Sequence, residues 1–240
     1  MPSEQMNEQQ VAAYLHRDLR EVVKLASRGQ IPCRRVGGRF LFRKGEVDHW
    51  VETQMHEMDK HQLAGIERGV SAHHGFDDTA EIVCSLIPPE GLAVPLLAHS
   101  RDSVIRDLVG LADEAGLVYA KDDLVQNILQ REELCSTAMV PGVALPHPRH
   151  PLPHDIASSF VIVGLTPSAI PFGAHDGGLT RLFFLICCKD DRTHLHVLAR
   201  LGRLLQDRRD IDRLLEARTA DELRTILTGL EQEAIRSGNR

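Results

Sequence analysis

Two uninterrupted apolar runs, at residues 160–165 and 182–187, constrain the fold of this chain most strongly. Both are far shorter than the roughly 18–20 apolar residues that a membrane span needs, so we expect no membrane insertion. A strand with one solvent-exposed face alternates polar and apolar residues, whereas a strand buried on both faces is continuously apolar. The two runs therefore predict two buried strands at the centre of a sheet.

On both sides of these runs, apolar residues recur with the spacing of a helix. The predicted helices are residues 104–115, 122–131, 194–205, 210–217 and 220–227. Gly116 directly follows the first of them, at a position typical of a helix end. Strands and helices mixed over about 140 residues predict an α/β domain, with a mixed sheet flanked by helices, at residues 92–232.

Charge is distributed unevenly along the 240 residues. The chain has 28 Lys+Arg against 34 Asp+Glu, and this net charge of −6 taken alone argues against a nucleic-acid partner. Residues 1–56, however, carry +2, and the window 17–44 within them carries +7. We therefore expect two modules with different partners, residues 1–56 and 92–232, joined by a linker at 57–91 where no clear period persists.

The basic module has the signals of a small helical domain with a hairpin. Residues 7–15 predict a helix with Asn7 as its N-cap. A second helix starts near Asp18, with Leu19, Val22 and Val23 on its apolar side, and Gly29 ends it. Gly37-Gly38 between two β-prone runs predicts a hairpin turn, and residues 44–54 predict a third helix.

This order of elements resembles the excisionase-like winged helix-turn-helix family. The segments that carry the resemblance are Glu8–Leu15, Arg28–Pro32, Val36–Arg39 and Arg43–Trp50. The resemblance implies DNA binding, with the second helix in the major groove and the hairpin wing on the backbone or in the minor groove. It departs from the family at the turn His16-Arg17-Asp18, where a small polar turn is usual.

The implied DNA contacts are all basic. On or beside the second helix they are Arg17, Arg20, Lys24 and Arg28, and on the wing they are Arg34, Arg35 and Arg39. Phosphate contacts by such residues supply most of the sequence-independent affinity of DNA-binding proteins. One copy would read only a short site, so we expect a homodimer or a tandem partner. The alternative is that these arginines form a solvated face of a protein-binding domain.

Two histidine motifs mark the acidic module. His147 ends a proline-broken run, residues 141–148, in which Pro146 and Pro148 hold it in place. His194-Leu195-His196 opens a predicted helix, where the positive end of the helix dipole favours an anion. His147, His150 and His154 have irregular, proline-rich spacing, which does not indicate a metal site.

With residues 131–137, these motifs resemble the enzyme IIA domain of the fructose–mannitol class of the bacterial phosphotransferase system, which includes the nitrogen-regulatory IIA proteins. The segments are Arg131–Thr137, Gly142–His147 and Thr193–Leu198, in the family's order and spacing. The resemblance implies that His147 accepts a phosphoryl group from the phosphocarrier HPr. It also implies that Arg131 stabilises the transferring phosphate and that His194 assists, with His196 a bystander.

The implied chemistry suits these residue types. Imidazole is a good nucleophile near neutral pH, and an Arg fork matches the equatorial oxygens of a transferring phosphoryl group. We expect no cofactor. Pro148 departs from the family, because the small residue usual at that position would offer a backbone N–H to the phosphoryl group. Slower transfer or a sensing role would follow.

We interpret the chain as a regulatory phosphotransferase that forms a phosphohistidine and couples it to DNA binding. Two alternatives stay open: a plain carrier that passes phosphate to a separate enzyme IIB, and an interaction protein without the chemistry. The polar, acidic start is unlike a secretory signal, and five cysteines without a paired pattern fit a reduced compartment. We therefore expect a cytoplasmic protein.

Overall fold

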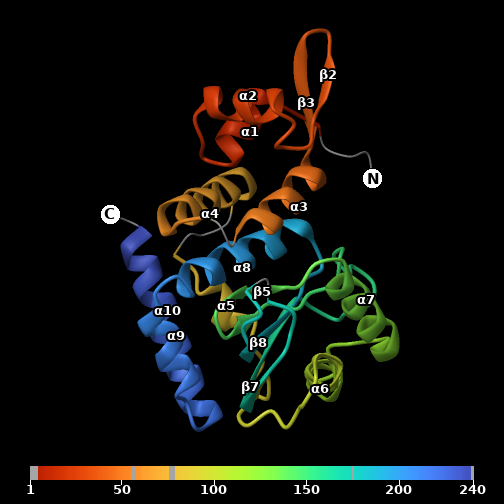
Figure 1. The fold of residues 1–240 in the computed structure, drawn as a ribbon, viewed down its shortest axis with the longest axis vertical. Coiled ribbons are helices and arrows are strands. Elements are labelled where there is room, and N and C mark those ends of the chain that lie inside the picture. Colours follow the sequence, from red (N-terminus) through yellow and green to blue (C-terminus); the bar gives the residue numbers. More distant parts are fainter. Residues whose placement is uncertain (1–4, 56–57, 76–78, 175, 239–240) are drawn as a thin grey trace.

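A computed structural model describes residues 5–55, 58–75, 79–174 and 176–238 (Figure 1). The N-terminal module contains α1 (Glu8–Tyr14), α2 (Leu19–Ser27) and α3 (Lys44–Gln54). Asn7 caps α1 by accepting the Gln10 N–H, and Asp18 caps α2 by accepting the Arg20 N–H. These caps satisfy backbone donors that a helix start leaves without partners, so each helix begins where the sequence predicts.

The predicted hairpin is present and forms a wing. β2 (Arg34–Val36) and β3 (Arg39–Arg43) pair antiparallel, with Val36 opposite Arg39. Gly37 and Gly38 have φ values of +55° and +84°, which glycine adopts without strain. The wing projects beyond the helices in Figure 1. A third strand, β1 (Gln5–Asn7), pairs with β3 and lies too close to the helix start to give a strand pattern.

The C-terminal module is built on a mixed five-stranded sheet in the order β4-β7-β8-β6-β5. Its strands are β4 (Leu92–Ala93), β5 (Ala138–Val140), β6 (Val143–Ala144), β7 (Phe160–Ile170) and β8 (Thr180–Cys187). β7 pairs antiparallel with β8, whereas β4–β7 and β6–β8 are parallel. The two apolar runs are the central strands, as predicted.

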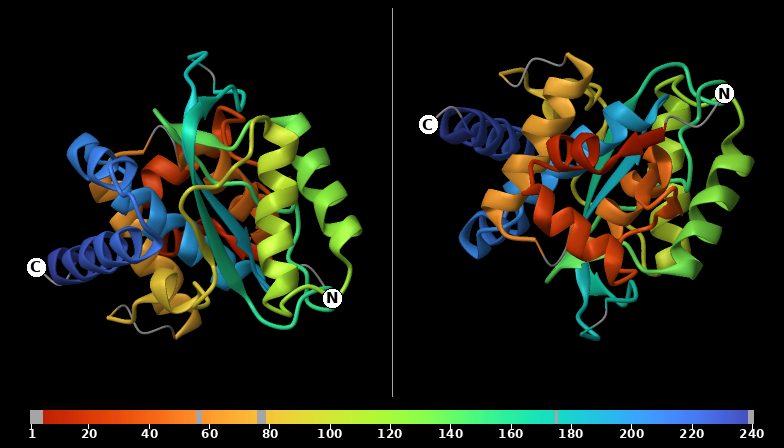
Figure 2. Two further views of the ribbon diagram at one scale, coloured as in Figure 1. Left: turned by 90° about the horizontal axis from the view of Figure 1, so that it is seen from below. Right: turned by 90° about the horizontal axis from the view of Figure 1, so that it is seen from above.

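Helices cover both faces of this sheet, which confirms the predicted α/β class (Figure 2). α6 (Arg101–Glu114) and α7 (Lys121–Leu134) share one core with Ile162 and Leu185. The alternate residues Val161 and Ile186 face a second core, which they share with the C-terminal helices. Those helices are α8 (Asp191–Leu204), α9 (Arg208–Leu215) and α10 (Ala220–Gly238).

The segment 57–91, expected as a linker, contains α4 (Lys60–His74) and the short α5 (Ile82–Ser85). α4 lies between the N-terminal helices and α8 (Figure 1). A Cβ at Gly69 would lie 2.1 Å from the Tyr14 carbonyl oxygen, so only glycine permits this close approach of α4 to α1. The core behind the second sheet face continues through α4 into the N-terminal module. Within the described ranges, no helix combines the length and apolar character that crossing a bilayer requires.

Candidate functional site

His147 and His194 meet at one edge of the sheet. β6 and β8 run parallel, so their carboxyl ends point to the same edge, and the chain continues from them into His147 and α8. The Ile186 N–H donates to the Pro146 carbonyl at 2.9 Å, which holds the residues that follow β6 beside the end of β8. The two imidazole rings lie 5.0 Å apart between centroids, with planes tilted by 57°. Both side chains are buried.

The tautomer of His147 follows from its backbone contact. Its Nδ1 lies 2.7 Å from the Leu145 carbonyl oxygen. A carbonyl oxygen can only accept, so Nδ1 carries a proton, and in the neutral imidazole the lone pair lies on Nε2. Nε2 is therefore the nucleophilic nitrogen of the ring.

His194 lies in the first turn of α8, which Asp190 caps by accepting the Thr193 N–H at 2.9 Å. A small pocket beside it is lined by Pro148, Arg149, His150, Pro151, Cys188, Asp191 and His194. Arg149 brings a cation to this pocket that the sequence reasoning missed. Its position two residues after His147 was the available signal.

Arg131 occupies the last turn of α7 and is buried. Its guanidinium donates to the Cys135 carbonyl at 2.8 Å. The segment after Arg131 reaches the His147 loop, because the Leu145 N–H donates to the Thr137 carbonyl at 3.0 Å. The structure thus joins the backbone of the Arg131 motif to that of the His147 motif.

His196 lies two residues beyond His194, and two residues advance about 200° around a helix, so the two histidines point to different sides of α8. The Nε2 of His196 lies 3.4 Å from Glu67 and 3.5 Å from the Ser71 hydroxyl, both on α4. The sequence interpretation of His196 as a bystander missed this contact. Ser71 lies 125 residues from His196 along the chain and Glu67 lies farther still, and no local pattern connects them.

A buried ion-pair network surrounds that contact. Glu67 binds Arg200 and Arg203 of α8, and Arg200 also binds Glu231 of α10 at 3.1 Å. Burial acts to raise the pKa of Glu67, but the hydrogen bond with His196 and the charges of Arg200 and Arg203 outweigh it, and the pKa falls to about 2. The network fixes α4 to α8 with matched charges in a site that excludes water.

A buried polar cluster lies within the N-terminal module, around Asp48. Asp48 of α3 accepts hydrogen bonds from the Tyr14 hydroxyl at 2.8 Å and from the Lys44 ammonium at 2.7 Å. Burial raises the pKa of Asp48, Lys44 opposes that rise, and the negative charge of Asp191 adds to it. Asp48 lies on α3, the helix of the N-terminal module that packs against α8.

Most residues predicted to contact DNA are exposed. Arg20, Lys24, Arg28, Arg34, Arg35 and Arg39 are all on the surface. Arg17 is half-buried, forms an ion pair with Glu21 and lies over the Trp50 ring at 5.8 Å. The placement of Leu19 and Val23 on the packed side of α2 is wrong, because both are exposed, whereas Val22 and Ala26 are buried. Apolar side chains among exposed basic ones suit a helix that lies in a DNA groove.

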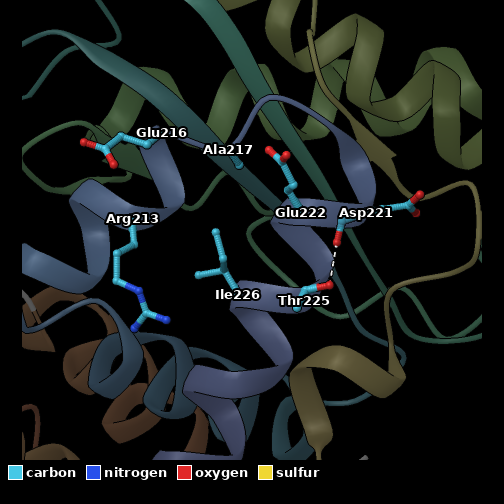
Figure 3. Close-up of a pocket in the computed structure, with 7 residues that line it drawn as sticks. All are labelled: Arg213, Glu216, Ala217, Asp221, Glu222, Thr225 and Ile226. Carbon is cyan, nitrogen blue, oxygen red and sulfur yellow. Dashed lines mark hydrogen bonds between the residues drawn. The ribbon is translucent and has the colours of Figure 1, made fainter.

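A larger cavity, of about 480 Å³, lies between α9 and α10, away from the histidine pair (Figure 3). Its walls carry Arg213, Glu216, Ala217, Asp221, Glu222, Thr225 and Ile226. Thr225 donates back to the Asp221 carbonyl at 2.8 Å within the helix. These side chains include no nucleophile comparable with His147. In the part of the chain that the structure describes, no group of three or more His, Cys, Asp or Glu is placed to hold a metal ion.

Solved structures share the fold of the C-terminal module. The nitrogen regulatory protein IIA-Ntr of Neisseria meningitidis aligns over 60% of this chain and 97% of its own, with a TM-score of 0.54 and 24% identity. The Escherichia coli enzyme IIA for mannitol, solved in complex with phosphorylated enzyme IIB, aligns over 59% and 96%, with a TM-score of 0.51 and 23% identity. The fold is therefore that of the IIA domains.

Sequence comparison gives the family. Residues 85–229 match the family described as "Phosphoenolpyruvate-dependent sugar phosphotransferase system, EIIA 2", and residues 6–55 match a helix-turn-helix domain. The chain belongs to this EIIA family, whose domains transfer phosphoryl groups through a phosphohistidine, and it carries a helix-turn-helix domain ahead of the EIIA domain.

Two relatives illustrate the match. The nitrogen regulatory protein of Bradyrhizobium diazoefficiens is 30% identical over 148 residues, which cover 60% of this chain and 94% of that protein. The fructose-specific EIIABC component of Bacillus subtilis is 25% identical over 147 residues, which cover 60% of this chain and 23% of that protein. The chain thus spans less than a quarter of the longer relative.

Proposed function

We propose that this protein is a phosphorylation-controlled DNA-binding regulator. His147 accepts a phosphoryl group from the phosphocarrier HPr, and the change at His147 alters DNA binding by the N-terminal module. The observation that carries this proposal is the position of α8. Its first turn brings His194 against His147, and its other sides contact α3 of the helix-turn-helix module and α4.

The transfer step uses the tautomer that Leu145 imposes. The Nε2 lone pair of His147 attacks phosphorus in line, a phosphorus–nitrogen bond forms, and the bond from phosphorus to the donor breaks with its electron pair returning to the donor. Arg131 and His194 stabilise the charge on the equatorial oxygens, and the proton on Nδ1 stays with the Leu145 carbonyl. Pro148 supplies no N–H, so transfer is slower than with a small residue there.

The coupling step is electrostatic. A phosphoryl group adds about −1.5 to −2 charges near neutral pH, and it arrives beside His194 and Asp191 at the N-terminus of α8. α3, which carries the buried Asp48, packs against α8, so the added negative charge disfavours the present packing of α8 against α3. A shift of α3 and α4 then moves α2 and the wing, and with them the exposed arginines that would contact DNA.

A carrier role is the second candidate. The mannitol IIA structure holds phosphorylated enzyme IIB, which supports a separate enzyme IIB as a further partner of this chain. In that case the N-terminal module localises the protein or forms a homodimer. DNA and HPr remain partners in the leading proposal, and a homodimer would place two recognition helices on one site.

The phosphoryl half is tested with the full-length protein, phosphoenolpyruvate, enzyme I and HPr. We expect a mass gain of one phosphoryl group in the wild type, no gain in His147→Ala, and an unchanged gain in His154→Ala, because His154 is exposed and does not line the pocket beside His194. A gain that persists in His147→Ala would contradict the assignment. No gain in any of these proteins would leave only the non-phosphorylated interaction protein.

A further inference from the structure

Glu132 is a buried carboxylate next to Arg131, and the steps above give it no role. It is 2% exposed in the last turn of α7. Its two oxygens accept the Thr137 N–H at 2.8 Å and the Thr137 hydroxyl at 2.7 Å. Both oxygens therefore hold one residue, and they hold it by its backbone as well as by its side chain.

Thr137 in turn holds the peptide that orients His147. The Thr137 carbonyl accepts the Leu145 N–H at 3.0 Å, and the Leu145 carbonyl accepts from Nδ1 of His147 at 2.7 Å. The hydrogen bond from Thr137 therefore fixes the position of Leu145, and Leu145 in turn orients the imidazole ring of His147. Two residues, Thr137 and Leu145, separate the carboxylate from the ring, and a hydrogen bond spans each of the three steps.

Burying a carboxylate to close a turn costs more free energy than burying a neutral side chain. Desolvating an ionised carboxylate costs several kcal/mol unless strong hydrogen bonds compensate, and a neutral side chain could cap the same turn at less cost. Charge-assisted hydrogen bonds are shorter and about twice as strong as neutral ones, so they hold Thr137 more rigidly. Rigid support is what a nucleophile needs to stay in one orientation.

We propose that Glu132 is a positioning residue for His147. Through Thr137 and Leu145 it keeps the imidazole proton on Nδ1 and presents Nε2 to the incoming phosphorus. This inference rests on the proposed phosphoryl acceptance for its kinetic part, whereas its effect on the tautomer can be measured without any phosphoryl donor.

The test uses four full-length variants. Glu132→Gln and Thr137→Val weaken the contact, and Thr137→Ser keeps the hydroxyl. Glu231→Gln is the matched control, because Glu231 is also a fully buried carboxylate that accepts two backbone N–H groups, from Val83 and Cys84 on α5. The readouts are the nitrogen-15 shifts of His147, the rate of phosphoryl acceptance from HPr, and the melting temperature.

We expect Glu132→Gln and Thr137→Val to increase the fraction of His147 protonated on Nε2 and to slow phosphoryl acceptance about tenfold. Thr137→Ser should restore both, and Glu231→Gln should lower the melting temperature without moving the His147 resonances. The inference is overturned if Glu132→Gln only lowers stability, as Glu231→Gln does, and leaves tautomer and rate unchanged. A wild-type protein that accepts no phosphoryl group overturns the proposed function instead.

Discussion

Glu67 is the residue on which the attachment of α4 to α8 depends. It is 2% exposed and contacts Arg200, Arg203 and His196. Removing one partner of a buried charge network leaves the others without compensation, which costs more than the network itself contributes. The charges of Glu67, Glu231, Arg200 and Arg203 balance, so each loss unbalances the set.

Glu67→Gln should lower the free energy of unfolding by about 3 kcal/mol at neutral pH. It should also flatten the acid limb of the stability curve. The folded pKa of about 2 lies below the usual 4.5, so Glu67 contributes its full stability above about pH 4.5 and loses it as the pH falls toward 2. Chemical denaturation as a function of pH measures both effects. Glu233→Gln, at an exposed position on α10, is the control, and equal behaviour of the two variants would refute the prediction.

Sequence reasoning located many single residues but few of their partners. Asn7, Asp18 and Gly37 follow local rules of capping and turns, and the structure confirms them. Glu67 and Arg200 lie 133 positions apart, and neither shows a local pattern. The exposure of Val23 could not be predicted either, because α2 packs on its neighbours through Val22, Leu25 and Ala26.

α4 connects the two modules because its opposite sides carry different contacts. Gly65 and Gly69 let it approach His16 and Tyr14 closely, and Glu67 and Ser71 face α8. The strands and most helices were predictable from period and turn signals, whereas the packing of α4 was not. Its pattern mixes glycines, charges and apolar residues, because it is buried from both sides.

Gly69→Ala should detach α4 from α1, because the new methyl group would lie 2.1 Å from the Tyr14 carbonyl oxygen. We expect a loss of about 1–3 kcal/mol and faster hydrogen exchange in α1 and α2. Gly229→Ala in α10 is the matched control, since nothing lies within 4 Å of the added carbon. Alanine favours a helix over glycine by up to about 1 kcal/mol, so this control should stabilise. Destabilisation by both would attribute the effect to something other than the α1 contact.

The wing carries exposed arginines on a rigid hairpin. Joint replacement of Arg34, Arg35 and Arg39 by Ala should weaken binding to a mixed-sequence DNA duplex and reduce the salt slope of log K by up to about 3. Fluorescence anisotropy over a salt series gives both values. Arg106→Ala, at an exposed position on α6, should leave them unchanged. An unaltered salt slope in the triple variant would remove the wing from the DNA interface.

In the whole molecule, the basic N-terminal module and the acidic C-terminal module with its histidine pair lie on opposite sides of α4. The net charge of −6 conceals this arrangement, because +2 in residues 1–56 is offset by −8 in the remainder. Charge and motifs together predicted the two modules from the sequence. The shared core and the role of α8 between them required the structure, because they depend on contacts between segments distant in the chain.

The central claim is that phosphorylation at His147 changes DNA binding, and the affinity of the same preparation before and after phosphorylation tests it most directly. Phosphoenolpyruvate, enzyme I and HPr supply the phosphoryl group, and a mixed-sequence DNA duplex at fixed salt is the probe. We predict a change in affinity of at least about fivefold in the wild type and none in His147→Ala. Fully phosphorylated wild-type protein that binds the duplex with unchanged affinity would contradict the account.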